Sequence, residues 1–292
     1  MNVIEVKDLT KDYGSGRGVF DVNIAVKKGE VFGFLGPNGA GKSTTIRHLM
    51  GFSKPDKGQT FIFGKPTFDK YYEILSKVGY IPGEIALPQG LTGWEFIRMM
   101  QNLQGIKNEE RLKQMLDLFE LDDIALRGET KRMSLGVKRK LAVVTAFMSD
   151  PEVLILDEPT SGLDPVMQEV FVNFIHEEKA RGKTILLSSH IFSEIDSTCD
   201  RIAIIKDGRI VSEFVADDLK HATLKFYSVK FASENDEKRF EKESKTISSL
   251  KTEGLDRDGK LKMSLEDKDL NAFIALLSDC NAVEFSNRRE TL

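Results

Sequence analysis

Short apolar runs separated by charged and glycine-rich loops predict that the first part of the chain is rich in strands. Apolar and polar positions alternate over Val3–Val6 and Val22–Val26, which is typical of half-buried strands. Val31–Leu35 is apolar apart from one glycine, which predicts a fully buried strand. A further strand is expected over Thr60–Phe63, and a helix near Lys42–Met50 after a glycine-rich loop.

Between about Pro88 and Met148 the apolar residues recur at helical spacing instead. Thr92 precedes Glu95 by three residues, which is the spacing of a capping box at a helix start. Two apolar stripes then predict helix faces that pack on a core. They comprise Phe96, Met99, Met100 and Leu103 in the first, and Leu112, Met115, Leu116 and Phe119 in the second.

Strands and helices alternate in the next part of the chain. Val153–Leu156 and Thr184–Leu187 read as buried strands, and Asp164 followed by Pro165 favours a helix start. The stretch from Ile202 to Val211 turns at Asp207–Gly208 and predicts a hairpin. Such alternation predicts an α/β fold with a parallel sheet covered on both faces.

After about Asp218 the pattern changes to β-α-β-β-α-β, which matches a small split βαβ unit. We therefore expect an α/β core over 1–218, with an inserted helical subdomain over about 87–148, and a small α+β accessory domain over 219–292. The six elements are Phe226–Phe231, Glu234–Ile247, two strands around Gly254 and Gly259, Leu270–Leu277 and Val283–Phe285.

Composition and charge exclude several classes of protein. The 292 residues carry 42 Lys and Arg against 46 Asp and Glu, a net charge of −4, whereas proteins built mainly to hold nucleic acid are usually basic. The two cysteines, Cys199 and Cys280, suggest neither a disulfide framework nor a zinc site. The charged N-terminus is unlike a signal peptide, and no apolar run approaches the roughly 18 residues of a membrane span. A membrane role would therefore need another chain.

One motif points directly to nucleotide chemistry. Residues 36–43, GPNGAGKS, fit the phosphate-loop pattern G-x-x-x-x-G-K-[ST] between a predicted strand and a predicted helix. Backbone amides of such a loop and the helix N-terminus attract phosphate. Lys42 would reach the β- and γ-phosphates of ATP, and the Ser43 hydroxyl would bind Mg²⁺.

A pair of carboxylates supplies the second chemical element. Asp157 and Glu158 follow the apolar run Val153–Leu156, which places them at the carboxyl edge of the sheet, where ligands bind in such folds. Asp157 would hold Mg²⁺, directly or through water. Glu158 would orient or deprotonate the attacking water.

These motifs, in this order, resemble those of the ABC-type ATPases, the nucleotide-binding subunits of ABC transporters, over about residues 2–218. The resemblance implies a phosphate loop, an aromatic residue on adenine, a magnesium strand over Val153–Pro159, a loop over Ser161–Asp164 whose Asp164 meets the opposite subunit, and a switch histidine that contacts the γ-phosphate. The nucleotide-binding positions are Tyr13, Gly36, Pro37, Asn38, Gly39, Ala40, Gly41, Lys42, Ser43 and Thr44, and the histidine is His190.

The family signature, which completes the ATP site of the opposite subunit, corresponds to Ser134, Leu135, Gly136 and Val137. Ser134 begins a predicted helix, and a serine with free amides at a helix start is an anion site. In the family, two subunits thereby enclose two ATP molecules head to tail. Leu135 replaces a usual glycine, as in the similar Ser-Leu-Gly of the bacitracin-exporter-like branch.

A second departure lies after Ile81. The family has a glutamine that touches Mg²⁺ and water and senses the membrane partner, whereas this chain has Gly83 followed by Glu84. Glu84 or water could substitute, or the metal shell could be looser. The basic run Lys138–Arg139–Lys140 is expected to be a solvated helix face.

The resemblance implies an ATPase that uses Mg²⁺ and couples dimer closure to export through a separate integral-membrane permease, at the cytoplasmic face of the membrane. The partner ATPase would be a second copy or a paralogue. A soluble ABC-type ATPase acting on nucleic acid, ribosomes or cofactor assembly is the alternative. One ATPase core, the absence of long heptad runs and the acidic charge disfavour it, so no nucleic-acid partner is expected. A non-hydrolysing regulatory subunit conflicts with the retained Glu158 and His190.

Overall fold

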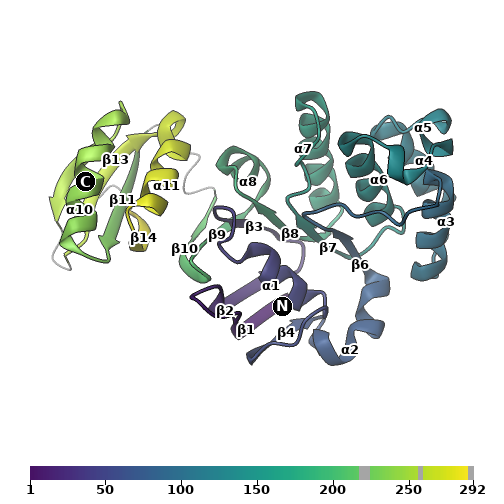
Figure 1. Ribbon diagram of the computed structural model, residues 1–292, viewed down its shortest axis with the longest axis horizontal. Coiled ribbons are helices and arrows are strands. Elements are labelled where there is room, and N and C mark those ends of the chain that lie inside the picture. Colours follow the sequence, from purple (N-terminus) through teal and green to yellow (C-terminus); the bar gives the residue numbers. More distant parts are fainter. Residues whose placement is uncertain (217–223, 256–258, 289–292) are drawn as a thin grey trace.

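Three β-sheets and the helices packed on them form the part of the chain that the computed structural model describes, residues 1–216, 224–255 and 259–288 (Figure 1). The largest sheet lies in the middle. A helical group lies at one end of the molecule, and a separate small sheet with two helices lies at the other. The expected α/β core with an inserted helical region and a C-terminal α+β unit is therefore confirmed as a fold class.

The N-terminal sheet is antiparallel and covers one side of the core. Its strands lie in the order β2-β1-β4-β5, and β1 is much longer than the alternation over Val3–Val6 predicted. Helix α2 follows it and was not predicted. The bounds are β1 Asn2–Asp12, β2 Gly18–Lys27, β4 Lys57–Ile62, β5 Lys65–Pro66 and α2 Thr67–Ile74.

The central sheet has six strands in the order β10-β9-β3-β8-β7-β6. All its pairs are parallel except the hairpin of β9 and β10, as the sequence predicted. Strand β6 was not predicted. The bounds are β3 Val31–Leu35, β6 Val78–Ile81, β7 Val153–Asp157, β8 Thr184–Ser189, β9 Arg201–Lys206 and β10 Arg209–Val215.

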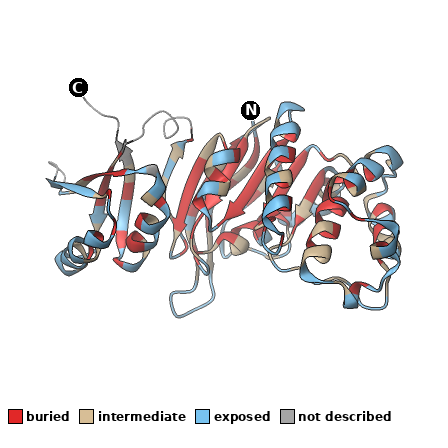
Figure 2. Cartoon of the chain, turned by 90° about the horizontal axis from the view of Figure 1, so that it is seen from above, coloured by how far each residue is buried: buried red, intermediate tan, exposed pale blue. Residues whose placement is uncertain are grey.

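Both faces of this sheet are buried, which Figure 2 shows as a red centre. On β3, Phe32 and Phe34 point to the N-terminal sheet and helix α1 (Lys42–Leu49), whereas Val31 and Leu35 join the cluster on the opposite face. Helices α7 (Pro165–Ala180) and α8 (Phe192–Thr198) pack on that second face. This two-sided burial explains why the strand is apolar without alternation.

Four helices form the inserted group: α3 Gly93–Gln104, α4 Glu109–Leu118, α5 Asp123–Arg127 and α6 Leu135–Phe147. The capping box is confirmed, because Thr92 Oγ1 accepts from the Glu95 amide at 3.2 Å. The predicted core stripes are confirmed except at Leu103, which is 73% exposed. The buried face of α3 runs through Ile97 and Gln101, so Leu103 in the last turn lies off it.

The C-terminal unit has the predicted β-α-β-β-α-β order, with an antiparallel sheet β12-β13-β11-β14. Tyr227 stacks on Phe285 at 4.8 Å between ring centroids, inside its core. The boundary expected at 218 lies outside the described residues. The bounds are β11 Leu224–Phe231, α10 Glu234–Glu243, β12 Lys251–Leu255, β13 Leu261–Glu266, α11 Leu270–Asp279 and β14 Ala282–Arg288.

The C-terminal unit contacts the core close to the phosphate loop. Strand β14 packs against β10, and Lys206 Nζ donates to the Leu277 carbonyl at 3.2 Å. A pocket is lined by Pro37 and His190 on the core side and by Ile274 of α11. Helix α11 therefore flanks the loop that the sequence assigned to phosphate.

Each helix of the described residues is too short or too polar to cross a bilayer. The longest, α7, has 16 residues. Within 1–216, 224–255 and 259–288, no helix combines the length and the apolar character that crossing a membrane requires.

Candidate nucleotide site

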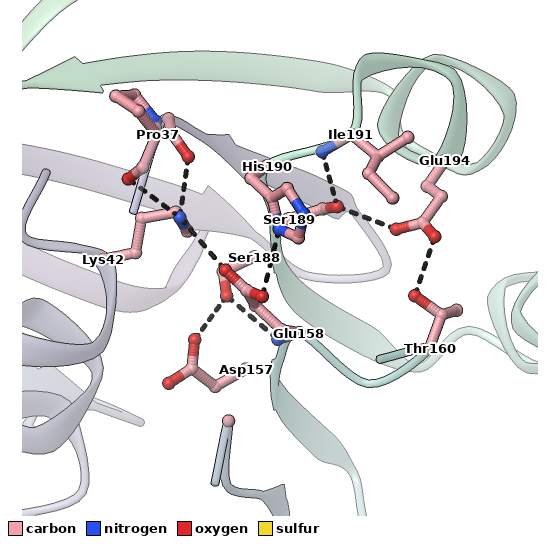
Figure 3. A network of polar contacts seen from close by, with 12 residues as sticks. Pro37, Lys42, Asp157, Glu158, Thr160, Ser188, Ser189, His190, Ile191 and Glu194 are labelled. Atoms are coloured by element: carbon pink, nitrogen blue, oxygen red, sulfur yellow. Dashed lines mark hydrogen bonds and ion pairs between the residues drawn. The ribbon is translucent and has the colours of Figure 1, made fainter. Parts of the chain in front are cut away.

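Four parallel strands bring the predicted chemistry to one edge of the central sheet (Figure 3). The phosphate loop follows β3, the carboxylate pair ends β7, the histidine follows β8, and Gly83 follows β6. Because parallel strands end at the same edge, residues that are far apart in sequence converge there.

The phosphate loop is shaped by close backbone packing. A Cβ at Gly36 would lie 2.4 Å from the Ile205 carbonyl oxygen, and Gly41 has φ +112° directly before α1. Both positions therefore require glycine. Lys42 is 4% exposed, and its Nζ donates to the carbonyls of Gly36 at 2.6 Å and Pro37 at 3.2 Å. The lysine thus folds back over the loop.

The start of α1 is suited to an anion. Its first turn has no acidic residue and its N-cap supplies no side-chain hydrogen bond, so the first amides are free for a ligand. Ser43 and Thr44 stand in this turn and are partly exposed. The helix dipole adds partial positive charge at the same point.

Glu158 lies between Lys42 and His190. Its Oε1 is 3.1 Å from Lys42 Nζ, and its Oε2 is 3.1 Å from His190 Nδ1. Its backbone has φ +46°, an uncommon value for a residue with a side chain. The amide donates to Ser188, which fixes this conformation. The structure therefore brings together three residues that the sequence placed in one site.

Asp157 is 2% exposed, and its two oxygens face different partners. Oδ1 accepts from Ser188 Oγ at 2.5 Å, whereas Oδ2 faces Gly83, whose Cβ would lie 3.0 Å away. Burial and the Asp157 charge raise the pKa of Tyr80 to about 12, so this phenol stays protonated. The Asp157 carboxylate is therefore positioned by the Ser188 hydroxyl on one side and by the turn at Gly83 on the other.

The donor set fits Mg²⁺ better than a metal held wholly by protein. In the described residues, no three His, Cys, Asp or Glu side chains cluster as a metal site. Mg²⁺ prefers oxygen, keeps several waters, and binds through one or two protein oxygens plus substrate phosphates. The Ser43 hydroxyl and the Asp157 carboxylate are such oxygens, at the loop and strand end where phosphates would lie.

A set of polar contacts around Glu194, called here the polar bracket, supports His190 and was not predicted from the sequence. Glu194 accepts from Thr160 Oγ1 at 2.8 Å and from Ser189 Oγ at 2.7 Å, and Ser189 Oγ accepts from the Ile191 amide at 2.9 Å (Figure 3). The bracket ties the residues on both sides of His190 to the loop after β7. The two serines before His190, at the end of a predicted strand, were the only sequence signal for these polar contacts.

The signature residues lie at the start of α6. Ser134 is its N-cap and accepts from the Val137 amide at 3.3 Å, as predicted. Leu135 is 59% exposed, and a Cβ at Gly162 would lie 2.9 Å from its Cγ. Gly136 also faces the Gly162 carbonyl. The substitution at 135 therefore packs on the loop over Ser161–Asp164 and leaves Ser134 exposed.

Tyr13 and Asp164 are both exposed at the surface. The Tyr13 ring is 52% exposed, and Lys11 Nζ lies 5.9 Å from its centroid. Asp164 caps α7 by accepting from the Met167 amide at 3.0 Å, as its position before Pro165 predicted. Both are accessible to a ligand or a partner.

The expectation that Lys138–Arg139–Lys140 forms a solvated face is wrong for Arg139. Its side chain is 2% exposed and donates to the carbonyls of Pro82 at 2.9 Å and Gly83 at 2.8 Å. Burial lowers the pKa of Arg139, and the charges of Asp157 and Glu158 oppose that effect. Helical periodicity explains the error, because one residue of any three successive ones can face inward.

A phosphate loop, a buried strand-end aspartate and a following glutamate at the edge of a parallel sheet define a P-loop ATPase. The chain belongs to the ABC transporter family, whose model, described as "ABC transporter", matches residues 19–161. It is similar to the "Bacitracin transport ATP-binding protein BcrA" of Bacillus licheniformis, with 40% identity across 80% of this chain and 76% of that protein. It is also 34% identical to the "Nod factor export ATP-binding protein I" of Burkholderia orbicola, across 72% of this chain and 70% of that protein.

Solved structures show the same fold. The "Structure of ATP binding subunit of ABC transporter" matches with a TM-score of 0.69 and 35% identity, over 75% of this chain and 92% of that one. The "Dimeric Structure of MJ0796, a Bacterial ABC Transporter Cassette" has a TM-score of 0.64 at 24% identity, over 73% of this chain and 98% of that one. This likeness supports the fold alone. The chain is thus an ATP-binding, ATP-hydrolysing member of the family.

Proposed function

We propose that this chain is the subunit that couples ATP hydrolysis to export through a separate integral-membrane permease. The observation that carries the hydrolytic part is the position of Glu158 between Lys42 and His190, at the mouth of the phosphate loop. The export part rests on relatives, because one is named for bacitracin transport and another for Nod factor export.

ATP would bind with its phosphates over residues 36–44, on the free amides of α1. Lys42 has to exchange some of its contacts for phosphate oxygens, and Glu158 is among those partners. Phosphate binding would therefore release Glu158 from the lysine. Tyr13, which is exposed, would stack on adenine.

Ser43 and Asp157 would hold Mg²⁺, which supplies charge neutralisation at the phosphates when bound. Ser188 fixes the rotamer of Asp157, so the carboxylate is already oriented. Glu158, freed from Lys42, would accept a proton from the attacking water. His190, held by the bracket around Glu194, would orient Glu158 and the γ-phosphate.

A second ATP-binding subunit would complete each site. Ser134, Leu135, Gly136 and Val137 begin a helix whose N-cap is exposed, so they are accessible to a phosphate held by another chain. Asp164, exposed nearby, would contact that subunit. The partner would be a second copy of this chain or a paralogue.

The permease would recruit this chain to the cytoplasmic face of the membrane, and the likeness to transport ATP-binding proteins supports this part of the proposal. We assign residues 1–218 to the ATP-binding domain, with the helical subdomain over about 87–148, and residues 219–292 to an accessory domain. The helical group and the turn at Gly83 would transmit closure to the permease.

The test is an affinity purification of the tagged full-length chain from detergent-solubilised native membranes, followed by mass spectrometry. We expect a stoichiometric polytopic partner, and the presence or absence of a paralogous ATPase distinguishes heterodimer from homodimer. An unrelated protein with the same tag is the control. Recovery only with ribosomal, nucleic-acid-binding or assembly proteins from the soluble fraction would contradict the proposal and favour the soluble-ATPase alternative.

A further inference from the structure

Arg139 is a buried cation that is bound by carbonyls instead of a carboxylate. Its guanidinium donates to Pro82 O at 2.9 Å and Gly83 O at 2.8 Å, and its Nε is buried without a hydrogen-bond partner. Among the described residues it has no ion pair within 4.0 Å. A buried charge is costly and persists only where its geometry is well supported, so this arrangement needs an explanation.

The turn that Arg139 holds lies directly against the proposed magnesium carboxylate. A Cβ on Gly83 would come within 3.0 Å of Asp157 Oδ2 and 3.2 Å of its Cγ. Any displacement of the turn towards β7 would therefore push on Asp157. Glu84, the neighbouring carboxylate that could substitute for the family glutamine, is exposed.

The same helix carries the signature. Ser134 is the N-cap of α6, and Arg139 lies five residues later on it. A regular helix of 13 residues is an element through which a displacement at one end can be carried to the next turns. A movement of α6 at its Ser134 end therefore reaches the turn at Gly83 through two hydrogen bonds.

We propose that Arg139 is a positioning residue for Asp157, and that it links the signature helix to the metal edge of the same chain's site. Its planar fork grips two successive carbonyls of the turn and thereby fixes the backbone that packs on Asp157 Oδ2. Gly83 has no side chain with which to position Asp157. Arg139 instead fixes the turn beside Asp157 from helix α6. The inference rests on the roles of Asp157 and Ser134 in the proposed function.

Charge supports the assignment. The carbonyl partners carry no charge, so no direct ion pair among the described residues neutralises the guanidinium, and Asp157 and Glu158 both interact with it electrostatically. It therefore offsets part of the carboxylate repulsion that phosphates would meet at this edge. A lysine would keep that charge but could not hold both carbonyls in one plane.

The experiment compares Arg139→Gln and Arg139→Lys with the wild type and with Arg132→Gln and Arg132→Lys, which make the same changes at a side chain that is 83% exposed. For Arg139→Gln we expect ATP affinity in EDTA within about twofold of wild type, because the phosphate loop is untouched. The Mg²⁺ concentration for half-maximal ATPase should rise about tenfold or more, as when a residue supporting a metal ligand is removed. Amide hydrogen exchange at Gly83 and Glu84 should accelerate about tenfold.

Arg139→Lys should restore the positive charge but not the paired hydrogen bonds to the two carbonyls. Its amide exchange at Gly83 should therefore stay fast, and its Mg²⁺ requirement should lie between those of the wild type and Arg139→Gln. The Arg132 variants should match wild type. A purely structural role for Arg139 would lower the melting temperature and ATP affinity in EDTA together. Wild-type Mg²⁺ dependence with wild-type exchange in Arg139→Gln would overturn the proposal.

If the Arg139 variants fail to fold, Gly83→Ala tests the same contact from the other side. The added methyl should press on Asp157 and raise the Mg²⁺ requirement while Arg139 remains in place. An unchanged requirement there would equally overturn the inference. Failure of the transport proposal is distinguishable, because a wild-type ATPase that recovers no permease leaves these results intact.

Discussion

Lys42 Nζ lies 3.1 Å from Glu158 Oε1, so the residue expected to bind phosphate and the residue expected to activate water are paired with each other. Lys42 is 4% exposed, which shields this pair from solvent. A phosphate that reaches Lys42 therefore competes with Glu158 and releases it at the point where water would attack. Binding and activation are linked through one ammonium group.

Glu158→Gln should abolish turnover while preserving ATP binding. The amide removes the base, which typically contributes a factor of about 10² or more, and it also removes the ion pair that competes for Lys42. ATP affinity should equal or exceed that of wild type by calorimetry. Glu152→Gln, at a carboxylate that is 60% exposed, is the matched control and should keep full activity. Unchanged turnover in Glu158→Gln would show that another group is the base.

Lys42→Ala should weaken ATP binding by about ten- to a hundredfold, because charge-assisted hydrogen bonds contribute about 1.5–3 kcal/mol each. Titration calorimetry of ATP measures the change directly. Lys54→Ala, at an exposed position after α1, should bind ATP normally. Equal affinities for the two variants would refute the assignment of the phosphate loop.

Ser134→Asp separates helix capping from phosphate contact. Aspartate is as good an N-cap as serine, so the free energy of unfolding should change by less than about 0.5 kcal/mol. Its negative charge would repel a phosphate held by a second subunit, so ATPase activity should fall at least about tenfold. Asn108→Asp makes a comparable change at the N-cap of α4 and should leave activity intact. Full activity in Ser134→Asp would remove the signature from the site.

His48 should make the protein less stable as the pH falls. Burial lowers the pKa of His48 below the ordinary 6.5, and the hydrogen bond that its Nδ1 donates to the Thr44 carbonyl opposes this effect only in part. Its Nε2 is buried without a hydrogen-bond partner. Below about pH 6.5 the unfolded chain takes up a proton there that the folded chain does not, so acid favours unfolding. The melting temperature of the wild type should fall when the pH is lowered from 7.5 to 5.5, and that of His48→Asn should fall by less. The exposed His176→Asn should follow wild type.

Phe174→Ala should destabilise the junction between the helical group and α7. Its ring lies 4.8 Å from that of Phe147 and 5.7 Å from that of Phe119, and it is 2% exposed. Loss of a buried phenylalanine costs about 3–5 kcal/mol of unfolding free energy, which urea titration measures. Ile124→Ala, at a residue that is 82% exposed, should cost under about 0.5 kcal/mol. A similar cost for both would show that this contact does not hold the junction.

Strong local signals made much of the fold predictable. Val31–Leu35 was identified as a buried strand because it is apolar apart from one glycine. Thr92 and Ser134 were identified at helix starts because a hydroxyl there satisfies a free amide, and Asp164 because the proline that follows it tolerates the first helical position. Strand β6 and helix α2 escaped prediction because each is short, so its periodicity spans too few residues to stand out.

The sequence by itself determined the chemistry: the order of Lys42, Ser43, Asp157, Glu158 and His190 at strand ends identifies an ATPase site, because parallel strands bring their carboxyl ends to one edge. Only the tertiary structure decided which side chains meet. The sequence predicted that Arg139 is a solvent-exposed charge, yet it donates to the carbonyls of Pro82 and Gly83 beside Asp157. That contact joins residues 56 and 57 positions apart, and such pairings depend on how helices dock on the sheet, which local periodicity does not encode.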